Sequence, residues 1–577
     1  MSRLGDKSIV LHWDQSTDPT LAGYNVYRGA SGTGLFTKQN TSLLPSAGYC
    51  DLTVANGQTN FYQVTAVNTS AMESAPSSVL AATANPFTNT DQFLDYIQET
   101  AFDYFWYLAN PLNGLIPDRS ESSSPCSIAV VGFGLTAIGI AIDHGWISRS
   151  QGAGRVLTTL NTFLSGPQGP GETGVIGYNG WFYHFLGMTN GLRANSELSS
   201  IDTALLLGGI LYDKQYFDGA NTDETSIRSM AGEIFNRVNW AWMSNGTNAV
   251  ATAWYPNTGF SGSYWTGYNE GMIIYLLGLG SSTSPLPASS WNYWTEGYIW
   301  LTNYAQQYVY FPPLFTYEYS HCWIDFRHVA DSYMNNHGST YFENSRRASL
   351  AQVTYCGSLP NPSIDVGYST NVWGLTASDD PQGYTSHGIP PDGFDDGTIA
   401  PTAAGGAIAF TPEFSEPTLS YFYNHYRPHI WTAYGFRDAF NLGKGWYDVD
   451  ELGIDEGPIV IMIENYRTQR VWRLFMQNPE IQVGLQRAGF ISLPFVTLAA
   501  QAQPEQGVVT LTWQSQTNHT YQVEYSPDLQ SWFSSPTGEV VATNAISSWT
   551  DSGPPATSST PFGVDARFYR VFEFGSL

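Results

Sequence analysis

The sequence predicts a small β-sandwich, a large helical barrel and a second small β-sandwich, in that order along the chain. At both ends, apolar residues alternate with polar ones in short segments separated by turn residues, which is typical of half-buried strands. Between the ends, apolar residues recur every three or four positions for about four hundred residues, which is typical of amphipathic helices. We therefore expect three domains, covering residues 1–85, 86–492 and 493–577.

The first predicted sandwich has alternating segments at 9–13, 23–27 and 60–67. Their sequences resemble a fibronectin type III domain, with Trp13 as the core residue between the sheets and Tyr62 on a late strand. Modules of this kind are usually spacers, so the resemblance bears on the fold and says little about function.

The middle of the chain is predicted to be helical from residue 90, because apolar residues from Phe93 to Leu108 recur at helical spacing behind the start signal Thr90-Asp91. Further helices are predicted at 127–144, 154–164, 200–217, 225–243, 268–279, 290–307, 344–357, 417–425 and 458–476. About a dozen helices joined by long loops suggest helical hairpins around a ring, with function carried by the loops. Alternation returns at 507–513, 519–525 and 567–572, which predicts the second sandwich.

Composition excludes several classes of function. Lysine plus arginine is 23 and aspartate plus glutamate is 49, giving a net charge of −26. This charge opposes binding to nucleic acid or to an anionic membrane surface, so we expect neither partner. The 19 Trp, 36 Tyr and 31 Phe fit either core filling or stacking on the apolar faces of sugars, and composition alone favours core filling.

The cysteines and the apolar segments indicate neither a disulfide scaffold, nor a cysteine metal site, nor a membrane-spanning helix. Cys50, Cys126, Cys322 and Cys356 are too few for a disulfide scaffold and form no CxxC pair, so structural thiols are expected and their disulfide state stays open. The longest apolar run, 128–142, is shorter than the roughly 18–20 residues that span a bilayer. The first residues are not a signal peptide, so either the protein stays inside the cell or a processed signal has been replaced by a starting methionine.

The first two groups of candidate functional residues each precede a helix. Glu197 and Asp202 follow the aromatic segment 180–185, which contains Trp181 and His184; for either carboxylate alone, helix capping is the better interpretation. Glu270 lies among Tyr264, Trp265 and Tyr268, where desolvation would raise its pKa towards that of a general acid. A capping role for Glu270 is equally compatible with its position.

Two further groups combine aromatic and charged residues. In 317–327, Asp325 and Arg327 are predicted to form an ion pair that holds a wall of the site, and His321 and Trp323 to contact sugar. Segment 373–381 contains Trp373 and Asp379. The acidic cluster Asp392, Asp395 and Asp396 invites a calcium hypothesis but lacks the spacing of a calcium loop, so we expect no metal.

The last group combines segment 435–440 with Asp455 and Glu456, which stand just before a long apolar helix. Capping is a serious alternative, but a carboxylate flanked by glycine at the start of a helix also suits a general base that holds a water molecule. Serine-hydrolase, Walker, dinucleotide and His-Glu-x-x-His motifs are absent from the sequence, so we expect no cofactor. The sequence does contain paired carboxylates near aromatic rings, and active sites that hydrolyse glycosides use these residue types.

Several of these segments together are similar to one family. The motifs are Ser196-Glu-x-Ser-x-Ile-Asp-Thr-Ala, Gly267-Tyr-Asn-Glu, Tyr319-Ser-His-x-Trp-Ile-Asp-Phe-Arg, Tyr341-Phe-Glu-Asn-Ser-Arg-Arg, Trp373-Gly-Leu-Thr-Ala-Ser-Asp, Asp396-Gly-Thr-Ile-Ala-Pro-Thr-Ala and Gly453-Ile-Asp-x-Gly-Pro-Ile. In this order, over about 91–489, they resemble the bacterial glycoamylase-like domain family and, with it, glycoside hydrolase family 144, the endo-β-1,2-glucanases. The resemblance implies an (α/α)6 barrel as catalytic domain, flanked here by two small all-β sandwich modules.

The resemblance also implies hydrolysis of β-linked glucans, first of all β-1,2-glucan, with inversion at the anomeric carbon. Glu270 would be the general acid and Asp455 the general base, and the proton could travel through a substrate hydroxyl or a water chain. The other residues implied to line the sugar cleft are Glu197, Asp202, Trp181, His184, Tyr268, His321, Trp323, Asp325, Arg327, Trp373 and Asp379. We expect a secreted or periplasmic monomer whose partner is an oligo- or polysaccharide.

Two other functions remain open from the sequence. One is an exo-acting enzyme, either a β-glucosidase or one that releases a disaccharide, because loops at one end of a cleft convert endo into exo action. The other is a carbohydrate-binding protein without turnover. A structural or adhesive protein would account for the two β modules but would leave the carboxylate clusters unexplained.

Overall fold

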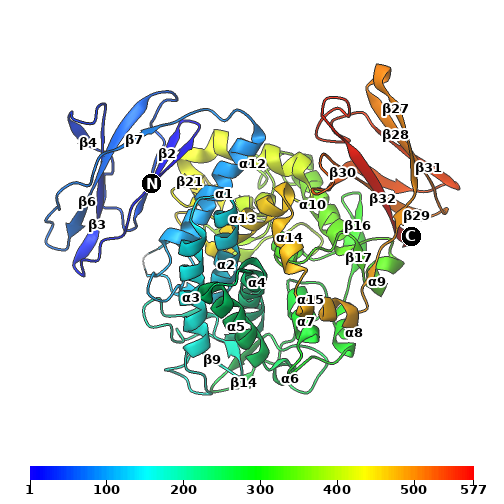
Figure 1. Cartoon of the computed structure of the whole chain (residues 1–577), viewed down its shortest axis with the longest axis horizontal. Coiled ribbons are helices and arrows are strands. Elements are labelled where there is room, and N and C mark those ends of the chain that lie inside the picture. The colour runs from blue at the N-terminus through cyan, green and yellow to red at the C-terminus, as the bar shows by residue number, and fades with distance from the viewer. Residues whose placement is uncertain (122, 577) are drawn as a thin grey trace.

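The computed structural model describes residues 1–121 and 123–576. Helices fill the centre of the molecule, and a β-rich region lies at each end, one formed by the N-terminal part of the chain and the other by the C-terminal part (Figure 1). The predicted order of β, helical and β segments is therefore correct. No helix within the described residues is long and apolar enough to cross a membrane.

The N-terminal β-rich region contains two antiparallel sheets, with strand orders β1-β2-β5 and β4-β3-β6-β7. Ile9 and Leu11 of the first sheet and Val26 and Tyr62 of the second lie in one hydrophobic core, against which Trp13 packs. The strands are β1 (Ser2–Gly5), β2 (Ser8–His12), β3 (Leu21–Gly29), β4 (Phe36–Lys38), β5 (Gly48–Asp51), β6 (Thr59–Asn68) and β7 (Leu80–Thr83).

A buried ion pair fastens this region to the helices. The guanidinium of Arg3 donates two hydrogen bonds, of 2.8 and 3.0 Å, to the carboxylate of Asp103 on α1 (Thr90–Tyr107). Glu99 lies 2.6 Å from the third guanidinium nitrogen. Asp103 is fully buried, and a buried charge left without its partner is costly. The N-terminal region therefore has a fixed place against α1.

Close packing of glycines organises the central helices. Helix α2 (Ile128–Asp143) is apolar and almost wholly buried, and it packs against α4 (Ser200–Tyr216). A β-carbon built on Gly209 would lie 2.1 Å from the carbonyl oxygen of Gly132, so only glycine permits this approach. The other helices are α3 (Arg149–Ser165), α5 (Thr222–Arg237), α6 (Trp240–Met243), α7 (Met272–Gly280), α8 (Ser289–Thr295), α9 (Ser332–Asn336), α10 (Tyr341–Ser358), α11 (Pro401–Gly406), α12 (Pro412–Ile430), α13 (Gly453–Arg467), α14 (Arg470–Phe475) and α15 (Pro479–Arg487).

The structure corrects three predicted helices. Segment 290–307 is not one helix: α8 ends at Thr295, and β15 (Trp300–Asn303) and β16 (Gln306–Val309) form a hairpin whose turn residues Tyr304 and Ala305 have positive φ. Segment 225–243 divides into α5 and α6, and segment 458–476 divides into α13 and α14 at Gln469, where φ is 57°. Apolar periodicity continues through these interruptions, so it does not detect them.

Short strand pairs hold the loops between the helices. They pair β8 with β11, β9 with β10, β18 with β19 and β21 with β22, and they form two three-stranded sheets with the orders β12-β13-β14 and β20-β23-β24. Their bounds are β8 (Cys126–Ser127), β9 (Gly177–Tyr178), β10 (Trp181–Phe182), β11 (Phe185–Leu186), β12 (Leu198–Ser199), β13 (Ala253–Tyr255), β14 (Gly259–Phe260), β18 (Ala377–Asp380), β19 (Gly383–Ser386), β20 (Thr398–Ile399), β21 (Trp431–Thr432), β22 (Gly435–Phe436), β23 (Phe440–Asn441) and β24 (Trp446–Tyr447).

The C-terminal β-rich region also contains two sheets, with orders β26-β32-β29-β30 and β27-β28-β31. Its buried Glu524 accepts hydrogen bonds from Arg570, at 2.6 Å, and from His328 of the helical region, at 3.0 Å. These contacts fix the region against the helices. Its strands are β26 (Phe495–Val496), β27 (Leu498–Gln503), β28 (Val508–Gln514), β29 (His519–Ser526), β30 (Phe533–Val541), β31 (Ile546–Asp551) and β32 (Phe568–Ser576), and β25 (Ile491–Ser492) pairs with β17 (Val329–Ala330) just before it.

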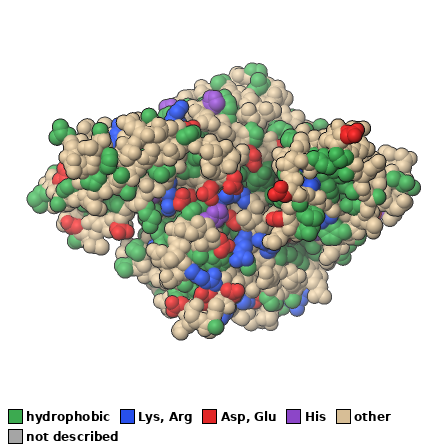
Figure 2. All heavy atoms as spheres, turned by 45° about the horizontal axis from the view of Figure 1, so that its top comes forward, with side chains coloured by type: hydrophobic (Ala, Val, Ile, Leu, Met, Phe, Trp, Pro, Cys, Tyr) green, Lys and Arg blue, Asp and Glu red, His purple; other side chains and the backbone are tan. Residues whose placement is uncertain are grey.

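Charged side chains of both signs are mixed at the centre of the face drawn in Figure 2, between the two β-rich regions. Ion pairs also join helices that lie far apart in the sequence. His144 contacts Asp95 of α1 at 3.1 Å and Glu464 of α13 at 2.8 Å, and Arg467 lies 3.1 Å from Asp95. These pairs tie α1 and α13 to the end of α2. The four cysteines, which all lie within the described residues, are unbonded.

Candidate active site

Five helices place the candidate residues. Helices α7, α4, α2, α13 and α11 contact one another in that order. Glu270 directly precedes the N-cap of α7, Asp202 lies in the first turn of α4 and Asp455 in the first turn of α13. The predicted carboxylates therefore come from the starts of helices that lie side by side, although they are far apart in the sequence.

Asp455 is a buried carboxyl group with an unusual pKa. Burial, together with the negative charges of Glu456, Glu318 and Asp379, raises its pKa to about 7. Its Oδ2 is buried without a hydrogen-bond partner in the described residues. Helix α13 has Leu452 as its N-cap residue and no side-chain cap, so the capping alternative for Asp455 does not hold.

Asp438 is the direct partner of Asp455, and sequence reasoning missed it. The two carboxyls interact: burial, together with the charge of Asp455, raises the pKa of Asp438 well above its usual range. Its Oδ2 accepts the backbone N–H of Asp379 at 2.6 Å. The pKa of Asp438 thus lies above that of Asp455, so Asp455 is the first of the two to become a carboxylate as the pH rises. A lone aspartate in 435–440 carried no pattern that could have revealed this pairing.

Glu270 is the second carboxyl with a pKa in the neutral range. Burial raises its pKa to about 7, and the nearby charge of Asp202 adds to the rise. The N-cap of α7 is Gly271 and no side chain caps the helix, so capping does not explain Glu270. The pKa of the buried Tyr319 is raised by burial and by the charges of both Asp455 and Glu270, which places the two carboxyls near the same ring.

His184, Glu197 and Asp202 form a cluster beside Glu270. His184 Nδ1 lies 2.8 Å from Glu197 Oε1, and its Nε2 lies 3.6 Å from Asp202 Oδ1. Burial disfavours the charged imidazole, but the two carboxylates outweigh it and raise the pKa of His184 to about 9. Asp202 Oδ2 also accepts the hydroxyl of Ser199, the N-cap residue of α4, at 2.5 Å. Part of the role of Asp202 is thus to hold the start of the helix, as the capping interpretation predicts.

Asp379 joins the site through Arg119, which sequence reasoning also missed. Arg119 Nη1 donates to Asp379 Oδ2 at 2.8 Å and lies 3.7 Å from Asp450. Asp379 stands on β18, directly opposite Tyr384 on β19. Tyr384 is 56% exposed, so the hairpin presents an aromatic ring beside the carboxylates. Neither Arg119 nor Tyr384 belongs to a recognisable sequence motif.

Three tryptophans predicted to contact sugar are completely buried, and these predictions are corrected. Trp181 donates its indole N–H to the carbonyl of Asn239 at 2.9 Å. Trp323 donates to Thr136 at 2.9 Å and stacks on a phenylalanine of α2, and Trp373 has no exposed surface. Rings enclosed on all sides by the core have no face to offer a ligand.

Four other predicted contacts also serve the structure. Tyr268 and His321 are 3% and 1% exposed, and burial lowers the pKa of His321 to about 3. Arg327 binds Asp325 through bonds of 2.8 and 2.7 Å and donates to the carbonyl of Trp532 in the C-terminal region. The predicted Asp325–Arg327 pair exists, but it holds the C-terminal region and does not line the cluster around Asp455.

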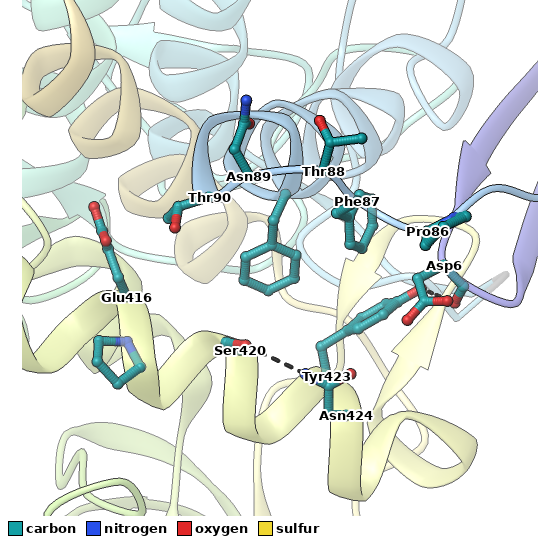
Figure 3. Close-up of a pocket in the computed structure, with 12 residues that line it drawn as sticks. Asp6, Pro86, Phe87, Thr88, Asn89, Thr90, Glu416, Ser420, Tyr423 and Asn424 are labelled. Carbon is teal, nitrogen blue, oxygen red and sulfur yellow. Dashed lines mark hydrogen bonds between the residues drawn. The ribbon is translucent and has the colours of Figure 1, made fainter.

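A separate pocket of about 430 Å³ lies at the junction of the N-terminal region and α12 (Figure 3). Glu416, Ser420 and Asn424 line its α12 side, and the hydroxyl of Tyr423 points to Asp6, whose carbonyl it binds at 2.9 Å. None of the candidate carboxylates lines this pocket, so it is not part of the active site.

Comparisons with known proteins identify the family. Residues 262–479 match the glycoamylase family, described as "Putative glucoamylase". The exo β-1,2-glucooligosaccharide sophorohydrolase (non-reducing end) of Parabacteroides distasonis is 30% identical over an alignment of 525 residues, which covers 84% of this chain and 69% of the relative. The chain belongs to the glycoamylase-like family. It is a glycoside hydrolase, as the sequence motifs predict.

Two solved structures extend the likeness to the fold. The β-1,2-glucanase of Parabacteroides distasonis has a TM-score of 0.76 and 27% identity, over 85% of this chain and 72% of its own. The endo-β-1,2-glucanase of Chitinophaga pinensis, in complex with sophorotriose and glucose, has a TM-score of 0.65 and 30% identity, over 70% of this chain and 98% of its own. The smaller Chitinophaga enzyme therefore matches a part of this chain almost completely.

Proposed function

We propose that this glycoside hydrolase cleaves β-1,2-glucan by an inverting mechanism, with Glu270 as general acid and Asp455 as general base. One observation carries the assignment of the residues: two carboxyls at the starts of different helices, whose charges both raise the pKa of Tyr319, each have a pKa raised to about 7 by burial. The named activities of the relatives on β-1,2-linked glucose chains support the substrate.

The two carboxyls would divide the chemistry. Protonated Glu270 gives its proton to the glycosidic oxygen of the leaving sugar, directly or through a substrate hydroxyl or water. A water molecule attacks the anomeric carbon from the opposite face and gives its proton to the Asp455 carboxylate. The interaction with Asp438 lowers the pKa of Asp455 and so favours the carboxylate form that the reaction requires. Inverting pairs stand about 6.5–9.5 Å apart to admit this water.

A second candidate is release of a disaccharide from the chain end. The relative that matches 84% of this chain is named as an exo-acting sophorohydrolase, whereas the relative matching 70% is named as an endo-glucanase. The products separate the two: a ladder of short β-1,2-linked oligosaccharides supports endo action, and a single disaccharide supports exo action. Incubation with β-1,2-glucan, β-1,3-glucan, starch, cellulose and aryl β-glucosides, followed by chromatography, makes this test. Absence of product from every substrate would contradict hydrolysis.

We also propose that the helical part is an (α/α)6 barrel spanning 86–492, with sandwich modules at 1–85 and 493–577, the first of fibronectin type III type. The paired sheets that share a core in each β-rich region support the modules. A crystal structure tests the arrangement.

We also propose a secreted or periplasmic location, which a polysaccharide substrate supports, and a monomeric state. Cell fractionation and light scattering test these two proposals.

A further inference from the structure

Three groups of histidine and acidic side chains bring three possible ligand atoms within 4.8 Å of one another in the described residues. Two of them, His184–Glu197–Asp202 and Asp379–Asp438–Asp448, belong to the candidate active site. The third consists of Asp380, His387 and Asp396, which the proposed hydrolysis does not use. These three residues come from β18, from the segment after β19 and from the loop before β20.

The imidazole of His387 is held in one orientation. The residue is completely buried. Its Nδ1 lies 3.2 Å from the carbonyl oxygen of Thr376, and because a carbonyl only accepts, Nδ1 carries the hydrogen. Among the residues that the structure describes, Nε2 has no hydrogen-bond partner. It points between two carboxylates, 3.6 Å from Asp380 Oδ2 and 3.4 Å from Asp396 Oδ1. A backbone carbonyl on one nitrogen and a free second nitrogen is the usual arrangement of a metal-binding histidine.

These distances fit ligands around a cation better than hydrogen bonds. A charge-assisted N–H···O bond is about 2.7–2.9 Å long, shorter than either separation. Ligand atoms around a tetrahedral ion with bonds of about 2.1 Å stand about 3.4 Å apart. Both carboxylates are also oriented from outside: Asp380 Oδ1 accepts the N–H groups of Gln382 and Gly383, at 2.5 and 3.0 Å.

Asp396 is held in the same way. Its Oδ2 pairs with Lys444 Nζ at 2.6 Å, and its Oδ1 accepts the N–H of Thr398 at 3.0 Å, which leaves one lone pair of Oδ1. The acidic cluster that the sequence suggested does not assemble, because Asp395 is bound to the hydroxyls of Tyr355 and Tyr368. Only Asp396 of that cluster faces His387.

We propose that His387 Nε2, Asp380 Oδ2 and Asp396 Oδ1 bind one divalent cation of the zinc type, with water as a further ligand. One imidazole and two carboxylates form a donor set that suits Zn²⁺. Lys444 offsets one of the two negative charges, so the site presents one net negative charge to the ion. The cation joins the strand that carries Asp380 to the loop before β20. Such a bond stabilises the folded hairpin, because the three ligands are brought together in the geometry of the site only when the chain is folded.

The site lies back to back with the candidate active site. Successive side chains of a strand point to opposite faces, so Asp379 and Asp380 of β18 point in opposite directions. Asp379 faces Arg119, and its backbone N–H binds Asp438. The cation therefore fixes, from behind, the strand that positions Asp379. Binding of the cation is independent of the proposed function.

Metal binding by the full-length protein tests the proposal. After treatment with a chelator, the protein is titrated with Zn²⁺ by calorimetry and with Co²⁺, whose tetrahedral complexes absorb strongly in visible light. We expect one equivalent of each ion. His387→Ala should weaken binding by more than the roughly 10–100-fold that loss of an outer-shell partner costs. His425→Ala, at an exposed histidine of α12, is the matched control and should bind like the wild type.

Each outcome decides the matter. No binding by the wild type, or unchanged binding by His387→Ala, overturns the site. Loss of binding in His184→Ala but not in His387→Ala places the ion in the other cluster and also overturns it. If His387→Ala does not fold, Asp396→Asn replaces it, because Asp396 retains some exposure and its amide can still accept from Thr398. Activity is not the readout, so a failure of the proposed hydrolysis would not affect this result.

Discussion

The pH dependence of glucan cleavage is the sharpest test of the roles of Glu270 and Asp455. Asp455 must be ionised to accept a proton, and Glu270 must be protonated to donate one. Both pKa values are about 7. At pH 7, about half of each group is in its required form, so about a quarter of the molecules have both.

The same calculation gives the decrease of kcat/KM below and above pH 7. At pH 5 about 1% of Asp455 is ionised while almost all Glu270 is protonated, and at pH 9 the situation is reversed. We therefore expect kcat/KM to be greatest near pH 7 and to fall about 25-fold at pH 5 and at pH 9. The acidic fall reports Asp455, because its raised pKa makes it gain a proton as the pH drops through 7, and the alkaline fall reports Glu270.

The assay is the initial rate of reducing-sugar release from soluble β-1,2-glucan at low substrate concentration. Enzyme held at each pH and returned to pH 7 controls for inactivation. A profile that changes less than about threefold between pH 5 and 9 would refute the assignment, because at least one group must then titrate outside this range. An optimum below pH 5 would refute it too.

Three further predictions concern single residues. Glu270→Gln should lower kcat by about 10²–10⁴-fold, the usual contribution of a general acid. Isothermal titration should show that oligosaccharide affinity is retained. An equal loss of kcat and of affinity would make Glu270 a binding residue. Arg3→Ala should destabilise the fold by about 3–5 kcal/mol, because the buried Asp103 loses its guanidinium partner and keeps only His12, 3.1 Å away. An unchanged thermal midpoint would show that this ion pair does not fasten the N-terminal region. The pKa of His144 is raised to about 9 by its hydrogen bonds to Asp95 and Glu464, which outweigh the opposing effect of burial. Its stabilising effect should therefore be complete below about pH 6.5 and lost as the pH rises through 9. The stability difference between wild type and His144→Asn should thus shrink from pH 6.5 to 9.5, and a constant difference would contradict the ion pairs.

The sequence predicts the order of the elements well because apolar periodicity reports which residues face a core. It predicts α1, with Asn89 as cap just before the expected start, and the apolar α2. It fails at the β15–β16 hairpin, because the turn depends on Tyr304 and Ala305 taking positive φ. Neither residue type announces that conformation.

The candidate site also contains residues that the sequence predicts and residues that it does not. Glu270, Asp455 and the His184 cluster lie in motifs, so residue type and neighbours point to them. Asp438 becomes important only because folding places its carboxyl against Asp455, and a contact between distant segments leaves no trace in one sequence. The prediction that Trp323 contacts sugar was wrong for a related reason: the residue lies in a conspicuous motif, but its side chain packs in the core and donates to Thr136.

Because Trp181, Trp323 and Trp373 are buried, the exposed aromatic ring beside the carboxylates belongs to the β18–β19 hairpin. Residues directly opposite each other in an antiparallel pair share a face, so the exposed ring of Tyr384 stands on the same face as Asp379. That face carries the link to Arg119, and the opposite face carries Asp380 of the proposed cation site. One short hairpin thus connects an aromatic surface, the carboxylate pair and the cation. Movement of this hairpin would alter all three together, whereas the helices that carry Glu270 and Asp455 are fixed by the packed core.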